Sequence, residues 1–265
     1  MESAGKNEVP KGDIQILIES FAKEFIEFLQ NSKYTVVLTG AGVSTDSGIP
    51  DFRSQNGLYS KYDADKVFDI DYFLKDPTYF YKFAREEILK MLAVEPSATH
   101  NMLAKLEKEG LIKAVITQNI DLLHQKAGSK NVIELHGNIS KAYCIRCSKE
   151  YDFIKILKNS QNVPECTICG GLVKPNIVFF GEKLPEGELK KAFYLVNSCD
   201  LIIVMGSSLV VQPAASLPIY AVNNGAKFLI VNKGKTALDN ISTRKYDFNL
   251  NEFSKAVVDI LNREG

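Results

Sequence analysis

The stretch GAGVSTDSGIPDFRS, residues 40–54, directly follows YTVVLT, residues 34–39, and this junction of a buried strand with a glycine turn decides how the chain is interpreted. A glycine turn at the carboxyl end of a strand is a common place to bind phosphate. The glycines here form neither G-x-G-x-x-G nor the lysine-bearing phosphate loop. By themselves they do not separate a structural turn from a nucleotide site.

The residues after the glycines favour the nucleotide site. Ser44 and Thr45 can donate hydrogen bonds to phosphate or ribose oxygens. Phe52 and Arg53 lie side by side in a loop stiffened by proline, where a phenyl ring can cover a flat ring and a guanidinium can pair with phosphate. Each residue alone fits an ordinary core or surface role, but the block at the end of a strand predicts a bound nucleotide.

The rest of the chain repeats the same strand pattern. The apolar runs are continuous, as in strands that are covered on both faces, and helical patterns lie between most of them. The runs are 34–39, 112–118, 132–135, 201–206 and 227–232. This alternation predicts an α/β fold with a Rossmann-like parallel sheet and helices on both faces. We expect the first helix at 13–32, with Asp13 as its N-cap.

Small or polar residues follow every predicted strand. Because ligands of open parallel sheets bind outside the carboxyl ends of the strands, we expect these residues to share one crevice that holds a dinucleotide. They are Gly40-Ala41-Gly42, Gln118-Asn119-Ile120-Asp121, His136-Gly137, Gly206-Ser207-Ser208 and Asn232.

Of the three histidines, only His136 follows a predicted strand, where an imidazole can take a proton from a hydroxyl near neutral pH. We expect His100 to have a packing or surface role and His124 to be structural. Asn119 and Asp121 share a loop, and a carboxylate there can stabilise positive charge on a sugar or a cationic ring. Asp121 also fits a helix cap, so the sequence leaves both roles open.

Four cysteines form two C-x-x-C pairs with 18 residues between them. This spacing is typical of a structural zinc site with a closed shell of four thiolates, and a redox pair or disulfides explain it less well. The ligands expected for one Zn²⁺ per chain are Cys144, Cys147, Cys166 and Cys169. The surrounding segment is too short to bury its own core, so the metal would replace one.

These patterns predict the organisation of the chain. We expect a flexible N-terminal segment at 1–12, the nucleotide-binding domain at 13–140 and 176–265 with a helical insertion at about 55–100, and the zinc module at 141–175.

The 265 residues carry 32 basic and 32 acidic side chains. Because these charges balance, the protein has no overall positive potential that would attract nucleic acid. No apolar run reaches the roughly 18 residues of a membrane span, and the first residues are polar. We expect a cytoplasmic monomer with no membrane or direct nucleic-acid partner.

From Tyr34 onward the chain resembles a sirtuin of the compact bacterial type. The resemblance rests on long motifs in the expected order, together with the cysteine pairs. The motifs are GAGVSTDSGIPDFRS, TQNIDLLH, ELHG, KPNIVFFGE, GSSLVVQPAASLP and IVN. It implies an NAD-dependent protein lysine deacylase that acts on acyl-lysine proteins and releases nicotinamide, free lysine and O-acyl-ADP-ribose.

The resemblance also implies roles for individual residues. The NAD pocket would be lined by Ala41, Gly42, Ser44, Thr45, Phe52 and Arg53. The nicotinamide end and its ribose would be held by Gln118, Asn119, Ile120 and Asp121, with His136 as general base. The phosphates and the adenosine half would be held by Gly206, Ser207, Asn232 and Asn249. Asn249 stands where the family has an acidic residue. Val178, Phe179 and Phe180 would pair with the substrate backbone as an added strand.

Family members that prefer acidic acyl groups have a tyrosine followed three residues later by arginine. Here Tyr81 is followed at that spacing by Ala84, and Arg85 is one step out of register. With Tyr81 as a substrate contact, we therefore expect acetyl or other neutral acyl groups. Two alternatives remain: a mono-ADP-ribosyltransferase, and a non-catalytic NAD-sensing zinc-ribbon module that recruits partners.

Overall fold

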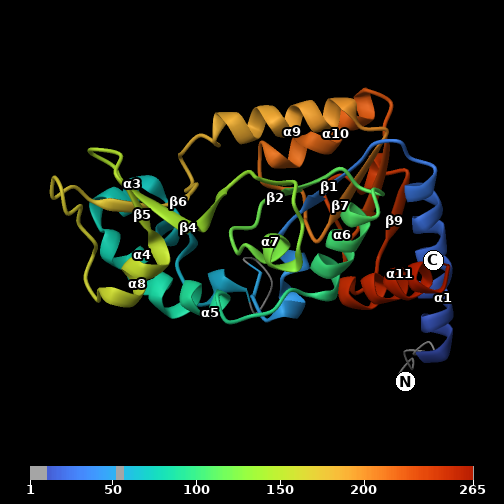
Figure 1. The fold of residues 1–265 in the computed structure, drawn as a ribbon, viewed down its shortest axis with the longest axis horizontal. Coiled ribbons are helices and arrows are strands. Elements are labelled where there is room, and N and C mark those ends of the chain that lie inside the picture. Colours follow the sequence, from blue (N-terminus) through green and yellow to red (C-terminus); the bar gives the residue numbers. More distant parts are fainter. Residues whose placement is uncertain (1–10, 52–56, 265) are drawn as a thin grey trace, which may run out of the picture.

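Six parallel strands form the larger sheet of the computed structural model, which describes residues 11–51 and 57–264 (Figure 1). The strands are β1 (Thr35–Thr39), β2 (Ala114–Thr117), β3 (Val132–Glu134), β7 (Leu201–Met205), β8 (Lys227–Val231) and β9 (Arg244–Tyr246). Their order across the sheet is β3-β2-β1-β7-β8-β9. All five predicted strands are confirmed. The sequence analysis missed β9, a three-residue edge strand in which only Tyr246 is buried.

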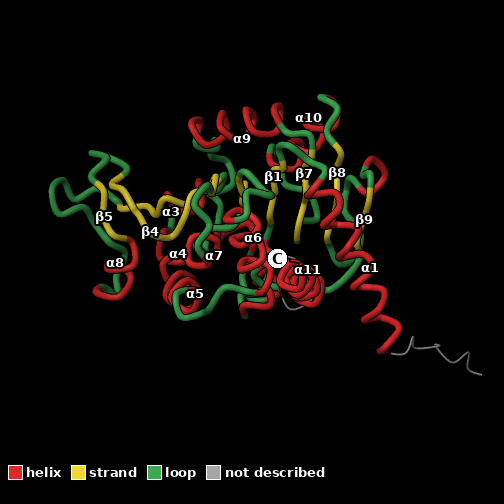
Figure 2. The backbone as a smooth tube through the Cα atoms, turned by 45° about the vertical axis from the view of Figure 1, so that its right-hand side comes forward, coloured by secondary structure: helices red, strands yellow, loops and turns green. Residues whose placement is uncertain are grey.

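Alternate residues of each strand enter two different cores, which explains the continuous apolar runs. Val37 and Ile203 face one core, while Val36 and Ile202 face the other. The first core is covered by α1 (Lys11–Gln30), α6 (Ala98–Lys108) and α11 (Leu250–Glu264). The second is covered by α9 (Glu186–Ser198) and α10 (Leu217–Asn223). Figure 2 shows these two groups of helices on opposite sides of the sheet. The predicted Rossmann-like architecture is confirmed.

The first helix begins at Lys11, two residues before the predicted N-cap. Asp13 therefore lies inside the first turn of α1, and its expected capping position is wrong. The segment expected to be flexible is 1–12, and residues 1–10 of it lie outside the described residues.

A second lobe contains the cysteines. Its antiparallel sheet has the order β5-β4-β6, with β4 (Gly137–Cys144), β5 (Glu150–Asp152) and β6 (Val173–Ile177). Its helices are α2 (Ala64–Val67), α3 (Ile70–Lys75), α4 (Pro77–Phe83), a π-helical turn (Ala84–Ile88), α5 (Leu89–Met91) and α8 (Phe153–Asn159). The helical insertion and the cysteine-bearing sheet share one hydrophobic core, which also contains Leu123 of α7 (Leu123–Ala127). The division at residues 141 and 175 stays a prediction.

The exits of β1 and β7 touch at three glycines. The Gly42 amide donates to the Gly206 carbonyl at 2.9 Å, and the Gly40 amide donates to the Met205 carbonyl at 3.1 Å. A Cβ on Gly42 would lie 2.8 Å from the Gly206 Cα, and one on Gly206 would lie 2.6 Å from the Val43 nitrogen. Because these neighbours are backbone atoms, only glycine fits at this contact.

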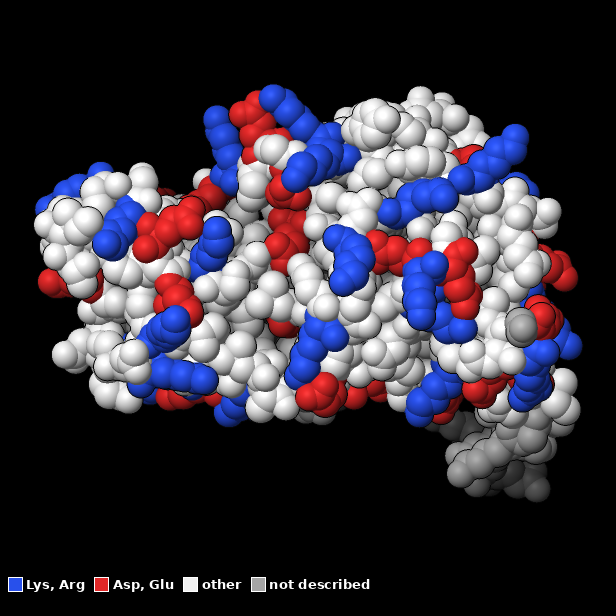
Figure 3. Space-filling model, in the orientation of Figure 1, with Lys and Arg blue, Asp and Glu red and all other residues white. Residues whose placement is uncertain are grey.

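Basic and acidic side chains alternate over the described part of the face in Figure 3, without one continuous basic surface. Among the helices that the structure describes, none combines the length and the apolar character needed to cross a bilayer.

The glycine contact predicts different costs for two alanine substitutions at positions with positive φ. Gly128 has a φ of 108° and open space around it, so Gly128→Ala should cost about 1–2 kcal/mol of unfolding free energy. Gly206 has a φ of 62° and the backbone clash as well, so Gly206→Ala should cost at least about 3 kcal/mol. Urea unfolding of both variants measures the difference, and equal costs would contradict the close contact.

Candidate functional site

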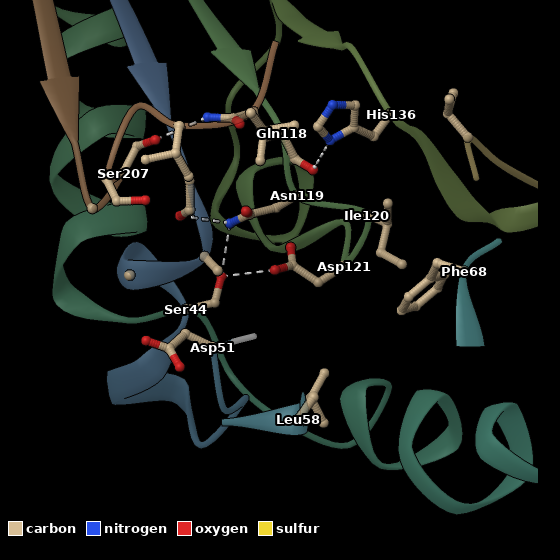
Figure 4. Close-up of a pocket in the computed structure, with 18 of the residues that line it drawn as sticks. Ser44, Asp51, Leu58, Phe68, Gln118, Asn119, Ile120, Asp121, His136 and Ser207 are labelled. Atoms are coloured by element: carbon tan, nitrogen blue, oxygen red, sulfur yellow. Dashed lines mark hydrogen bonds between the residues drawn. The ribbon is translucent and has the colours of Figure 1, made fainter. Parts of the chain in front are cut away.

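One cavity of about 1090 Å³ opens at the carboxyl ends of the parallel strands and extends to the second lobe. Gly42, Asp121, His136 and Ser207 come from four different strand exits, and all four line it. Figure 4 shows two hydrogen-bonded groups of side chains, one formed by Asn119, Ser44 and Asp121 and the other by Gln118 and Ser207. The crevice expected from the strand ends is therefore present.

Most residues singled out in the sequence line this cavity. They are Ala41, Gly42, Ser44, Thr45, Gln118, Asn119, Ile120, Asp121, His136, Val178, Phe179, Phe180, Gly206, Ser207, Asn232 and Asn249. Phe52 and Arg53 lie outside the described residues, so their expected roles stay predictions.

Asp121 is a nearly buried carboxylate held by two neighbours. Ser44 Oγ donates to Asp121 Oδ2 at 2.7 Å, and the Leu123 amide donates to Asp121 Oδ1 at 2.9 Å. Burial raises the pKa of Asp121, while these two donors lower it. The N-cap position of α7 is Leu122, so Asp121 lies one residue before the cap and binds the first amide of the helix from there. The bond to Ser44 ties the same carboxylate to the glycine loop, and its role toward a ligand stays a prediction.

Asn119 connects the same serine to the first strand exit. Its Nδ2 donates to Ser44 Oγ at 3.1 Å and to the Gly40 carbonyl at 3.1 Å. Ser44 thus accepts from Asn119 while it donates to Asp121. These bonds fix the orientation of three polar side chains at one end of the cavity.

His136 is oriented by a single backbone bond. Its Nδ1 lies 2.9 Å from the Gln118 carbonyl oxygen, which can only accept, so Nδ1 carries the proton of the neutral ring. Nε2 is left with a free lone pair. Burial lowers the pKa of His136 below its ordinary value of 6.5. A neutral imidazole that faces the cavity in this tautomer can accept a proton from a substrate hydroxyl.

The other two histidines lie behind the cavity wall. Ser97 donates its amide to His100 Nδ1 at 3.1 Å, and His100 Nε2 lies 3.5 Å from Ser44 Oγ. His124 Nε2 lies 2.9 Å from Thr39 Oγ1. Burial lowers the pKa of His100 to about 4 and that of His124 to about 3. Both rings are buried and hydrogen-bonded, as expected of structural histidines.

The far end of the cavity is formed by the exits of β2, β7 and β8. Gln118 Nε2 donates to Ser207 Oγ at 3.1 Å across the sheet. Asn232 donates its side-chain amide to carbonyls of the loop that follows it. Asn249 Oδ1 accepts two backbone N–H groups from the first turn of α11. An acidic side chain at this position could accept the same two N–H groups. Asparagine at position 249 therefore keeps the oxygen that caps the helix and removes only the charge.

The segment expected to add a strand has its amide groups already bonded within the chain. The Val178 amide donates to the His136 carbonyl at 2.9 Å, and the Phe180 amide donates to the Phe68 carbonyl at 2.6 Å. The Phe179 amide donates to Glu182 Oε2 at 2.8 Å. A substrate strand could use these three donors only by replacing the bonds that they already make, and the expected pairing with substrate stays a prediction. The half-exposed Phe180 side chain remains available for contact.

Tyr81 does not line the cavity. It is fully buried in the core of the second lobe, and its hydroxyl donates to the Val173 carbonyl at 2.5 Å. Arg85 donates to the Tyr81 and Ser160 carbonyls, with its guanidinium 5.7 Å from the Tyr81 ring centroid. The expectation of a substrate contact at Tyr81 is therefore corrected, because helix α4 presents this side chain to the core.

Several lining residues were not singled out from the sequence. Leu58, Phe68 and Met91 come from the helical insertion, and Gly181 and Glu182 follow the expected strand segment. The last two belong to the quoted motif KPNIVFFGE, which could have identified them. The first three gave no signal, since nothing in a helical pattern says which apolar residue faces a distant sheet.

The four cysteines come together in the second lobe, where none of them lines the cavity. All four Sγ atoms lie within 4.8 Å of one another, which suits a tetrahedral Zn²⁺ with Zn–S bonds of about 2.3 Å. The Arg146 and Ile168 amides each point to a sulfur at 3.4 Å and can stabilise thiolates. The donor set fits the predicted structural zinc site.

The family model described as the Sir2 family matches residues 40–213. An NAD-dependent protein deacetylase of Thermotoga maritima is 55% identical over 240 residues, which cover 89% of this chain and 97% of that protein. NAD-dependent protein deacylase 2 of Archaeoglobus fulgidus is 46% identical, with 84% and 89% covered.

Solved structures agree with these relatives. A Sir2 structure with deacetylated p53 peptide and 3'-O-acetyl-ADP-ribose has a TM-score of 0.87 and 53% identity, with 90% of this chain and 97% of that chain covered. A Sir2 structure bound to acetylated peptide has a TM-score of 0.84 and 52% identity, with 91% and 98% covered.

The cysteine geometry predicts one zinc ion that supports folding. We expect purified protein to hold about one equivalent of zinc, and Cys166→Ser to lose most of it together with thermal stability. Cys199→Ser is the matched control, because Cys199 is buried but lies outside the quartet. Elemental analysis and thermal unfolding measure both effects. Full zinc content in Cys166→Ser would contradict the assignment.

Proposed function

The chain belongs to the Sir2 family, and we propose that it is an NAD-dependent protein lysine deacetylase. It transfers an acetyl or other neutral acyl group from lysine to ADP-ribose, and it releases nicotinamide and O-acyl-ADP-ribose. The observation that carries this proposal is the single cavity that joins the glycine loops, Asp121 and His136. The match to deacetylases along nearly their whole length supports the same conclusion.

The central glycine loops suit the pyrophosphate of NAD. At Gly42 and Gly206 no side chain stands between the ligand and the backbone, and Ser207 and Gln118 add polar groups beside them. Asn232 and Asn249 line the part of the cavity where we place the adenosine half. This placement leaves the nicotinamide end beside Asn119 and Asp121.

NAD supplies a ribose carbon that accepts the amide oxygen of acyl-lysine when nicotinamide leaves. Positive charge then develops on the sugar, and a nearby carboxylate in a water-poor cavity stabilises it. Asp121 is held for this role by Ser44, which is itself held by Asn119. Phe52, outside the described residues, is proposed to cover the sugar once nicotinamide has left.

His136 is proposed as the general base for the ribose hydroxyls. Its Nδ1 proton is committed to the Gln118 carbonyl, so Nε2 is the nitrogen that can accept a proton. The lowered pKa of His136 keeps the ring neutral at and above neutral pH. The hydroxyl that it activates would attack the carbon of the acyl group.

The acyl-lysine end is proposed to lie against the second lobe. Phe68, Met91, Ile177, Val178 and Phe180 give the cavity an apolar wall there, which suits an uncharged acyl-lysine stem. Acyl-lysine proteins are therefore the proposed partners. A monomeric state, a cytoplasmic location and the absence of nucleic-acid partners stay predictions.

The zinc site has a structural role in this proposal. Cys144, Cys147, Cys166 and Cys169 would hold the ion, and four thiolates would complete its shell without a position for water or substrate. The chemistry is thus assigned to the cavity, and the zinc holds the outer part of the lobe that forms its acyl-lysine wall. For the chain as a whole, we propose the nucleotide-binding domain at 13–140 and 176–265 and the zinc module at 141–175.

Product analysis separates the proposed reaction from the alternatives. With an acetyl-lysine peptide and NAD, mass spectrometry should find deacetylated peptide, nicotinamide and O-acetyl-ADP-ribose in equal amounts. An ADP-ribosyltransferase would add ADP-ribose to a protein, and a non-catalytic module would release no nicotinamide. Either result would overturn the proposal.

His136→Ala should retain NAD affinity and lose about 10²–10⁴-fold in turnover, because only the proton transfer is removed. Calorimetry of NAD binding and steady-state rates measure the two effects. His100→Asn alters a histidine behind the wall and serves as the comparison. Undiminished turnover in His136→Ala would remove the base assignment.

The position of the Arg85 side chain predicts which acyl groups the enzyme prefers. Its guanidinium is engaged by carbonyls of the second lobe and does not line the cavity, so it is not placed to pair with an acidic acyl group. On one peptide sequence, kcat/KM for acetyl-lysine should exceed that for succinyl-lysine by at least about 10²-fold. Faster removal of succinyl would contradict this preference.

A further inference from the structure

Lys174 is a buried ammonium group next to the cavity wall. The residue lies in β6 and is only 2% exposed. Its Nζ donates to the Ile177 carbonyl at 2.7 Å, to Glu182 Oε2 at 2.8 Å and to the Pro175 carbonyl at 3.4 Å. The three N–H donors of the ammonium thus have three acceptors, so the charge is buried without an unpaired donor.

Aromatic rings complete the surroundings of this charge. Nζ lies 4.2 Å from the centroid of the Phe179 ring and 5.8 Å from that of Tyr143. The Phe179 ring is itself packed against Phe68, Phe73 and Phe80, with centroids 5.0–5.7 Å apart. The Phe179 ring is therefore in contact both with the ammonium of Lys174 and with aromatic rings of the helical insertion.

Glu182 forms an ion pair with Lys174 and a hydrogen bond with the backbone between them. The same oxygen, Oε2, accepts from Lys174 Nζ and from the Phe179 amide, and the Glu182 amide donates to the Phe179 carbonyl at 3.0 Å. Glu182 also lines the cavity. One ion pair thus fixes both ends of the turn from Ile177 to Glu182.

This turn carries a direct connection to the proposed base. The Val178 amide donates to the His136 carbonyl at 2.9 Å, and Ile177 pairs with Gly137. The other side of the turn, at Phe180, forms a β-bridge with Asp69 of the helical insertion. The turn thus connects the exit of β3 with the helical insertion, and residues 177–182 line the cavity.

We propose that Lys174 and Glu182 are positioning residues: their ion pair, the 174–182 clip, holds the turn 177–182 in the conformation that receives the acyl-lysine segment of the substrate. This inference rests on the proposed function of the cavity. A buried ion pair adds little net stability because desolvation opposes the Coulomb attraction. The ion pair instead selects one conformation of the turn, because each of its bonds ends on a specific atom of the turn.

The test compares Lys174→Met and Glu182→Gln with Lys141→Met. Lys174→Met replaces the aliphatic stem with one of four heavy atoms and removes the ammonium with its three bonds, while Glu182→Gln keeps a neutral carbonyl acceptor and removes the charge. Lys141 and Glu150 form the control pair, because they belong to the same antiparallel sheet but are 61% and 70% exposed. Each variant is assayed as the full-length protein with an acetyl-lysine peptide and NAD, and KM is measured separately for the two substrates.

Lys174→Met should raise the KM for peptide by about tenfold or more, with the KM for NAD within about twofold of wild type. Glu182→Gln should change the peptide KM in the same direction by a smaller factor, and Lys141→Met should leave both constants unchanged. The double variant Lys174→Met/Glu182→Gln should be no worse than Lys174→Met, because the clip acts as one unit. If Lys174→Met does not fold, Glu182→Gln and its peptide KM decide the question.

Equal changes in both KM values, or unchanged peptide KM in Glu182→Gln, would overturn the clip. The wild-type protein keeps the two proposals apart. If wild type fails to form O-acetyl-ADP-ribose, the proposed function fails. If wild type is active and the clip variants keep wild-type peptide KM, only this inference fails.

Discussion

The contact between Gly42 and Gly206 is the constraint on which the site depends. It joins the exits of β1 and β7, the two central strands, so closely that a single Cβ at either position would meet backbone. The loop after β1 then turns Ser44 toward Asp121 from the exit of β2, and the loop after β7 turns Ser207 toward Gln118. The polar side chains of the cavity come together because the backbones of the two glycine loops are in contact.

The second lobe supplies the other half of the cavity through a different kind of interaction. Its core is aromatic and apolar, and it reaches the cavity through Phe68, Met91 and the turn 177–182. This turn is bonded to His136 on one side and to the helical insertion on the other. The arrangement couples the position of the proposed base to the surface that would receive a peptide, and the buried charge of Lys174 lies at the junction.

The sequence predicted the features that arise from local pattern. The five strands are visible because each is apolar on both faces, and the residues at their exits follow from chain order and the geometry of parallel sheets. The cysteine quartet follows from spacing alone. The side chain of Tyr81 was misplaced because a helical pattern does not say which apolar core receives each residue, and here two lobes compete. The bonded amides of Val178–Phe180 depend on partners such as Phe68, more than 100 residues away. The edge strand β9 has mixed polarity, so its pairing with β8 comes from the sheet rather than from its own sequence.

The most direct test of this account is a crystal structure of the protein with bound NAD. Continuous density for the dinucleotide should cross the glycine contact, with the pyrophosphate within hydrogen-bond distance of the loops at Gly42 and Ser207. The nicotinamide ribose should lie beside Asn119 and Asp121, within reach of His136 Nε2, and the adenosine should lie beside Asn232. Density for NAD at another surface, or with its ribose remote from His136, would contradict the account.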